Sequence, residues 1–274
     1  MKFQILGTAA AEGWPAVFCH CDACEEARKH GELRSRSQAI IDEDLLIDFP
    51  GDTYYHAVLH NIDLSKIQTL LITHSHCDHF APLDLMTRGG CYAHKMAQPV
   101  LDIYSNETCK AIFDATVQYE IAPEIQKNLR YHILHPFMEF TAGSYRITSL
   151  KAFHAPAEEA LLYLIEKEGK TIFYCLDTGW LPEETYAQLR GKHIDLVAYD
   201  ATFGPKTFGD CHLGIPDAAQ IQERLKKMGC VDHNTIAIVT HFSHNCGAKS
   251  HAELVQCAEK YGFLTAYDGF TVEF

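Results

Sequence analysis

The stretch Thr-His-Ser-His-Cys-Asp-His, residues 73–79, follows the apolar run Leu-Leu-Ile at residues 70–72. The apolar run predicts a short buried strand, and the alternation of side chains along a strand would place His74 and His76 on the same side. Three imidazoles and one carboxylate so close in sequence are costly to bury unless a cation satisfies them. A rigid strand end also suits a catalytic metal site. We therefore expect a metal centre at this stretch.

A metal centre can draw further ligands from other parts of the chain. Three more residues of metal-binding type stand directly after predicted strands in the second half of the chain. They are His154 after residues 147–153, Asp177 after residues 172–176 and His241 after residues 236–240. We expect them to complete the site that the first motif begins, because strand ends hold ligands rigidly.

Residues 74–79 carry the signature His-x-His-x-Asp-His, and in this they resemble the metallo-β-lactamase superfamily. The resemblance implies an α+β fold, a four-layer αββα sandwich of two mixed β-sheets flanked by helices, with two metals at the lip between the sheets. It also implies the ligand sets, which are His74, His76 and His154 for one metal, Asp78, His79 and His241 for the other, and Asp177 as a bridging carboxylate.

The charge at the implied centre gives a hint about the substrate. Two divalent cations carry +4, the carboxylates of Asp78 and Asp177 carry −2 and a bridging hydroxide carries −1, which leaves about +1. That charge suits a phosphodiester monoanion, whose phosphorus the hydroxide would attack while the metals stabilise the equatorial oxygens. Histidine and carboxylate ligands fit zinc, manganese or iron, and we hold manganese and zinc as comparable.

A second cluster, Cys-His-Cys-Asp-Ala-Cys at residues 19–24, has the spacing Cys-x-Cys-x-x-Cys. Eleven cysteines in a chain without secretory features indicate reduced thiols. The loop around residues 19–24 therefore predicts a structural zinc held by Cys19, Cys21 and Cys24, and zinc takes four tetrahedral ligands. His20 stands between two of these ligands and is poorly placed to join them. The candidates for the fourth ligand are His244, Cys246 and Cys211.

Five motifs occur together and in order along the chain. They are the Gly7-Thr8 loop, the cysteine cluster, His-x-His-x-Asp-His, Asp177-Thr178 and Thr240-His241-x-x-His244. This combination is similar to the phosphoribosyl cyclic phosphodiesterase (PhnP-like) branch of the superfamily. The resemblance implies hydrolysis of a small cyclic phosphodiester such as 5-phosphoribosyl 1,2-cyclic phosphate. It also assigns His244 to the structural zinc and suggests a homodimer.

The leaving alkoxide of such a substrate needs a proton. His212, in the loop at residues 209–212, resembles the acid histidine of that branch, and Asp200, after the apolar run 196–199, would orient it. The alternative for His212 is an ordinary surface-loop histidine. We name His212, Asp200 and Asp78 as the catalytic residues.

Length, composition and net charge limit what can be predicted about domains, location and partners. The chain has 274 residues, of which 47% are hydrophobic, and it contains no visible linker or repeat, so we expect one domain over residues 1–274. No signal peptide or membrane-spanning run is visible, which predicts a cytoplasmic protein without a membrane partner. The net charge of −13 disfavours extended nucleic-acid binding.

Other functions share parts of this pattern. A tRNA 3′-processing nuclease and a thioesterase of the glyoxalase II type share the dinuclear motif. The negative charge and the lack of a Gly/Pro-rich insertion speak against the nuclease, and the cysteine cluster fits the thioesterase poorly. A non-catalytic metal-binding protein of the pyrroloquinoline quinone pathway type can lose catalytic ligands, whereas all seven are present here.

Elsewhere, the pattern predicts a helix over residues 53–60, with His56 and His60 on its surface, and another helix over residues 82–96. The cysteines outside the metal clusters are expected to pack in the interior. They are Cys77, Cys91, Cys109, Cys175, Cys230 and Cys257.

Overall fold

Two seven-stranded β-sheets form the centre of the molecule in the computed structural model, which describes residues 1–274. The first sheet has the order β14-β1-β2-β3-β4-β5-β6. Its strands are β1 (Lys2–Gly7), β2 (Gln38–Ile41), β3 (Leu45–Ile47), β4 (Thr69–Leu71), β5 (Leu101–Ser105), β6 (Leu129–Ile133) and β14 (Thr271–Glu273).

The second sheet has the order β13-β12-β11-β10-β9-β8-β7. Its strands are β7 (Glu139–Ala142), β8 (Tyr145–Lys151), β9 (Leu161–Lys167), β10 (Lys170–Cys175), β11 (Leu196–Asp200), β12 (Ile236–Thr240) and β13 (Leu264–Thr265). Both sheets mix parallel and antiparallel pairs, because β3 to β6 and β10 to β13 run parallel while β1, β2, β8 and β9 pair antiparallel.

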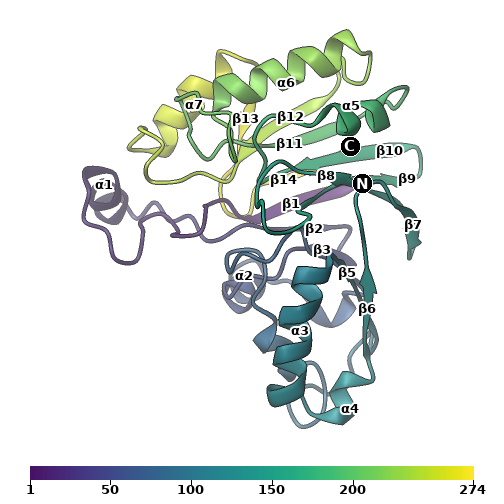
Figure 1. The fold of residues 1–274 in the computed structure, drawn as a ribbon. Coiled ribbons are helices and arrows are strands. Elements are labelled where there is room, and N and C mark those ends of the chain that lie inside the picture. The colour runs from purple at the N-terminus through teal and green to yellow at the C-terminus, as the bar shows by residue number, and fades with distance from the viewer.

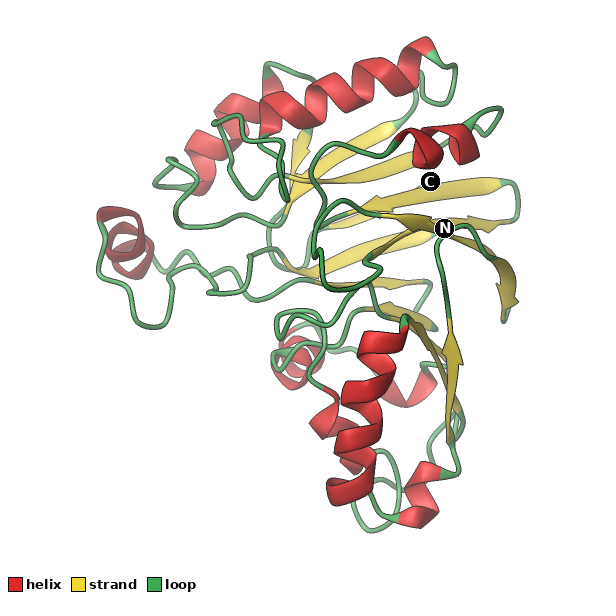
Figure 2. Cartoon of the chain, in the orientation of Figure 1, coloured by secondary structure: helices red, strands yellow, loops and turns green.

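Helices cover the outer faces of both sheets (Figures 1 and 2). The helices α3 and α4 lie over the first sheet and α5, α6 and α7 over the second, while α1 lies to one side. None of the helices has the length and apolar character needed to cross a membrane. The helical elements are α1 (Asp22–His30), α2 (Thr53–Leu59), the 3₁₀ turns η1 (Leu64–Lys66) and η2 (Pro82–Thr87), α3 (Glu107–Glu120), α4 (Pro123–Gln126), α5 (Glu183–Leu189), α6 (Ile215–Lys227) and α7 (His251–Glu259).

Alternating side chains connect three separate apolar layers. In β9, Leu161, Tyr163 and Ile165 point into the layer between the sheets, whereas Leu162 and Leu164 point into the layer under α5 to α7. A third layer lies between the first sheet and α3. Strands that are buried on both faces read as continuous apolar runs, which explains why their positions are visible in the sequence. This arrangement confirms the predicted αββα sandwich.

Several local predictions were wrong. The strand β4 ends at Leu71, so His74 and His76 lie in the loop that follows and strand alternation does not orient them. Residues 82–96 form only the short turn η2, because Gly89 and Gly90 both adopt positive φ angles and interrupt the helical pattern. The strand β5 was not predicted.

Three side chains also differ from the predicted burial. Cys77 and Cys91 are exposed and do not pack in the interior. His56 is 1% exposed instead of lying on the surface. Its Nε2 atom lies 2.7 Å from Ser35 Oγ and its Nδ1 atom 2.6 Å from Gln38 Oε1. These partners are 21 and 18 residues away in sequence, so helix periodicity could not reveal them.

The burial of His56 predicts a loss of stability in acid. Burial lowers the pKa of His56 to about 4, so the unfolded chain takes up a proton at a higher pH than the folded protein does. The contribution of His56 is complete above its unfolded pKa and is lost as pH falls from about 6.5 to about 4. We expect the loss of this contribution to lower the free energy of unfolding by about 2 kcal/mol as the pH falls from about 7.5 to about 5.

Urea denaturation of wild type and His56→Gln over this pH range measures how the free energy of unfolding of each protein depends on pH. The variant should show a weaker dependence on pH, whereas His233→Gln, at an exposed loop position, should follow wild type. Equal pH dependence in His56→Gln and wild type would contradict the prediction.

Candidate metal centre

The predicted ligands of the dinuclear site meet at one edge of the two sheets. Strands β10, β11 and β12 run parallel, and β8 points the same way because two antiparallel pairings separate it from β10. The chain leaves the carboxyl ends of β8, β10 and β12 at His154, Asp177 and His241. The loop 73–79 reaches this edge from the end of β4 in the other sheet.

Three residues at these strand ends have left-handed backbone. Asp48, Asp177 and His241 have φ angles of 65°, 52° and 65°. Such angles are uncommon for residues that carry a Cβ atom, and they often occur where a site requires a side chain in one direction. Here the left-handed backbone directs all three side chains toward His79. The distances to a His79 ring nitrogen are 2.7 Å from Asp48, 2.8 Å from Asp177 and 3.3 Å from His241.

The first group of ligand-type side chains contains His74, His76 and His154. One nitrogen from each ring lies within 4.8 Å of the others. His154 Nε2 is 3.1 Å from His76 Nδ1. Burial lowers the pKa of His74 well below its usual value, which keeps this ring in the neutral form that binds metals.

The second group contains Asp78, His79 and His241. His79 Nε2 lies 3.3 Å from both Asp78 Oδ2 and His241 Nε2. Asp177 stands between the two groups, because its Oδ2 is 2.8 Å from His79 Nε2 while its Oδ1 is 3.8 Å from His154 Nε2. Burial opposes ionisation of Asp177, but His241 and His79 hold its pKa well below the usual range.

The residues of both groups fit divalent cations. His74 Nε2, Asp78 Oδ1 and Asp177 Oδ2 are buried and have no hydrogen-bond partner of acceptable geometry. Buried polar atoms without partners are rare and costly, and all three belong to groups that ligate metals. A donor set of histidine nitrogens and carboxylate oxygens suits zinc, manganese or iron. The sequence prediction and the geometry therefore agree on where cations could be held.

Two further residues, Asp48 and Thr202, orient ligand-type histidines by contacting the second nitrogen of the ring. Asp48, at the end of β3, places Oδ2 2.7 Å from His79 Nδ1 and also accepts a hydrogen bond from the Thr73 amide. Thr202 Oγ1 lies 2.8 Å from His241 Nδ1. Such partners fix ring orientation and raise ligand basicity. The sequence analysis missed both residues, although Asp48 follows an apolar run just as Asp177 does.

His212 lies beside these groups, as the sequence predicted, and Asp200 contacts it. Its Nδ1 atom is 2.9 Å from Asp200 Oδ2 and 3.1 Å from Thr202 Oγ1. Burial acts to lower the pKa of His212, but the charges of Asp200, Asp177 and Asp78 outweigh it and raise the pKa to about 9. With Nδ1 held by Asp200, the Nε2 atom is left for a substrate.

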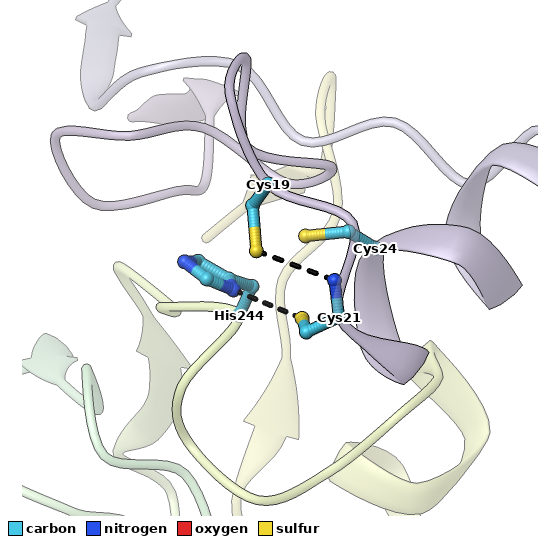
Figure 3. Close-up of side chains that lie close together, drawn as sticks. All are labelled: Cys19, Cys21, Cys24 and His244. Carbon is cyan, nitrogen blue, oxygen red and sulfur yellow. Dashed lines mark hydrogen bonds between the residues drawn. The ribbon is translucent and has the colours of Figure 1, made fainter.

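The cysteine cluster assembles at the start of α1 (Figure 3). Cys19, Cys21, Cys24 and His244 each place one ligand atom within 4.8 Å of the others, and Cys21 Sγ lies 3.4 Å from His244 Nδ1. A hydrogen bond from the Cys24 amide lowers the pKa of Cys21 to about 6, which favours the thiolate that binds zinc. The structure brings neither Cys246 nor Cys211 into this group.

A cleft of about 390 Å³ opens over the dinuclear groups. His76, Asp78, His154, Asp177, His212 and His241 form its floor. The rest of its wall comes from the loops after β1, β11 and β12, which supply Ala10, Ala11, Glu12, Thr202, Phe203, Ser243 and Asn245. The cleft therefore offers space for a small substrate directly above the candidate cation positions.

Comparisons with known proteins agree with this fold. The structure resembles a diphosphatase from the PhnP family, with a TM-score of 0.75 and 22% identity over 100% of this chain and 98% of that one. It also resembles zinc-bound PqqB from Methylobacterium extorquens, with a TM-score of 0.74 and 17% identity over 100% of both chains.

Sequence comparison gives shorter matches. An octanoyltransferase of Porphyromonas gingivalis is 34% identical over 110 residues, which cover 37% of this chain and 22% of that protein. The chain spans about a fifth of the length of the curated relatives that it matches.

The αββα fold and the donor set at its edge define a metal-dependent hydrolase of the metallo-β-lactamase superfamily. Within that class, residues 46–242 match the family model described as the beta-lactamase superfamily domain. The match covers more than half of the chain, so the chain belongs to this family.

Replacing Asp48 tests whether this buried carboxylate supports metal binding. Asp48→Asn removes the charge beside His79 Nδ1, so we expect metal affinity at the edge of the sheets to fall by about 10- to 100-fold. Chelator competition with metal analysis measures the change. Asp44→Asn is the control, because Asp44 accepts from Tyr145 and does not contact the ligands. Equal metal affinity in Asp48→Asn and wild type would contradict the role of Asp48.

Replacing Cys21 tests whether the two clusters are coupled. His241 and His244 stand three residues apart and would bind different metals. Cys21→Ser should therefore lower the thermal midpoint, release one zinc per chain and weaken metal retention at the dinuclear groups. Cys91→Ser, at an exposed cysteine outside both clusters, should change none of these. Unchanged metal content at the dinuclear groups in Cys21→Ser would show that they are independent.

Proposed function

We propose that this protein hydrolyses small cyclic phosphodiesters with two divalent cations, manganese or zinc, held by His74, His76, His154, Asp78, His79, His241 and Asp177. The observation that carries the proposal is the convergence of these seven side chains into two groups that share Asp177, next to the His212–Asp200 pair. We further propose that Cys19, Cys21, Cys24 and His244 hold a structural zinc.

The charge of the site supports an anionic substrate. Asp78 and Asp177 contribute −2 against +4 from two divalent cations, so the centre is positive although the chain carries −13. Bound cations would supply a nucleophile from water at neutral pH and stabilise the charge that develops on phosphoryl oxygens. The cleft of about 390 Å³ has room for a small diester.

The residues of the chain supply the proton transfer. Asp200 Oδ2 holds His212 Nδ1 at 2.9 Å, which fixes the ring and directs its Nε2–H toward the cleft. His212 then donates the Nε2 proton to the leaving alkoxide, and the Asp200 carboxylate stabilises the ring in its charged form before donation. Thr202 contacts both His212 and His241, so it links the acid to the neighbouring ligand.

The assay is phosphorus NMR of manganese-loaded protein with 5-phosphoribosyl 1,2-cyclic phosphate and nucleoside 2′,3′-cyclic phosphates. We expect ring opening of at least one of these substrates and about three metals per chain. A non-catalytic metal-binding protein would retain about one metal and open neither substrate. Three bound metals without ring opening of either substrate would contradict the phosphodiesterase proposal and would make thioesters the next substrates to test.

Replacing His212 tests the proton donor. His212→Asn should lower kcat on cyclic ribose diesters by about 10²- to 10⁴-fold, because their alkoxides leave poorly without a proton. It should affect bis(4-nitrophenyl) phosphate far less, because nitrophenolate leaves without protonation. His135→Asn, at an exposed position paired with Glu159, should match wild type. An equal loss on both substrates at full metal content would argue that His212 is not the acid.

A further inference from the structure

Glu12 lies on the wall of the cleft and has no role in the chemistry described so far. Its Oε1 atom accepts a hydrogen bond from the Ser243 hydroxyl at 2.5 Å. The loop that carries it is anchored to the same segment, since the Ala10 amide donates to Phe242 O. About a third of the Glu12 side chain is exposed, so the carboxylate is fixed but can still meet a ligand.

The cysteine cluster lies beside Glu12. His244 Nδ1 faces Cys21 Sγ at 3.4 Å, while its Nε2 lies 3.6 Å from Glu12 Oε1. At 3.6 Å the two side chains are neighbours without a hydrogen bond, so the Ser243 hydroxyl is the group that fixes Glu12. Residues 243–245 therefore connect the cluster, Glu12 and the cleft wall.

The cleft contains no lysine or arginine. Among its 13 lining residues, the carboxylates are Asp78 and Asp177 on the floor and Glu12 on the wall, and the positive charge of His212 is paired with Asp200. Two cations contact the backbone of wall residues, but each is already occupied by these and other partners. Lys206 Nζ donates to Asn245 O at 2.7 Å. Arg36 donates to Ala11 O at 2.9 Å and pairs with Asp52 at 3.2 Å.

We propose that Glu12 restricts this site to phosphodiesters whose organic part is uncharged and bears hydroxyl groups, and that it discriminates against a second phosphate there. The proposal rests on the phosphodiesterase function proposed above. A carboxylate accepts hydrogen bonds from hydroxyl groups, whereas protein sites for phosphate use arginine, lysine or backbone amides. A phosphate of charge −2 at about 6 Å from the carboxylate in solvent would lose roughly tenfold in binding.

The test compares two substrates that differ by one phosphate, ribose 1,2-cyclic phosphate and 5-phosphoribosyl 1,2-cyclic phosphate. With the manganese-loaded protein, we expect kcat/KM to favour the first by roughly tenfold or more. Glu12→Gln keeps a hydrogen-bonding side chain near Ser243 but removes the charge, so the ratio should fall toward one. High salt should also reduce the ratio in wild type.

Glu26→Gln is the matched control, because Glu26 lies on α1 outside the cleft and contacts only Lys29 and His30. It should leave the ratio unchanged, and zinc analysis confirms that each variant keeps its structural cluster. A wild-type preference for the 5-phosphorylated substrate would overturn the proposal and would make Lys206 the candidate phosphate ligand. A ratio that is the same in Glu12→Gln and wild type would overturn it as well.

Calorimetry with the ring-opened compounds separates this proposal from the proposed function. Wild type should bind ribose 1-phosphate more tightly than ribose 1,5-bisphosphate, and Glu12→Gln should reduce that difference. If this preference holds while no diester is hydrolysed, the phosphodiesterase proposal fails and the role of Glu12 stands. If diesters are hydrolysed without the preference, the role of Glu12 fails alone.

Discussion

The buried histidines and carboxylates at the edge of the two sheets cannot satisfy one another. His74 Nε2, Asp78 Oδ1 and Asp177 Oδ2 are all buried without an adequate partner. Several buried titratable groups in contact destabilise a fold unless charge of opposite sign offsets their desolvation. The geometry therefore suits bound cations, and the rest of the structure holds these side chains in position.

Strand ends provide that rigidity. His154, Asp177 and His241 stand close after the ends of β8, β10 and β12, and left-handed turns direct Asp177 and His241 to the same point, whereas the loop of residues 73–79 follows the end of β4. Glu158 accepts hydrogen bonds from the Ser75 amide and hydroxyl and from Asn106, which connects the loop of His154 to the loop of His76. Fixed backbone at several strand ends is what lets residues from both sheets share one site.

The cysteine cluster and the cleft are parts of one structural unit. The strand β12 leads into His241, and the next few residues supply Ser243, His244 and Asn245 to the cleft wall and the cluster. Glu12 contacts the same segment from the loop after β1. We therefore expect a change at the cluster to affect the ligand His241 and the cleft wall, because His241 and His244 are three residues apart.

The sequence by itself determined the residue types of the dinuclear site, the cysteine cluster and several of the strands. These depend on local patterns, which are an apolar run followed by a ligand, or thiols at fixed spacing. Tertiary structure alone decided that Asp48 supports His79, that His56 is buried and that Glu12 faces the cleft. Those contacts join residues as far as 231 positions apart, and sequence periodicity carries no information about pairs that only chain folding brings together.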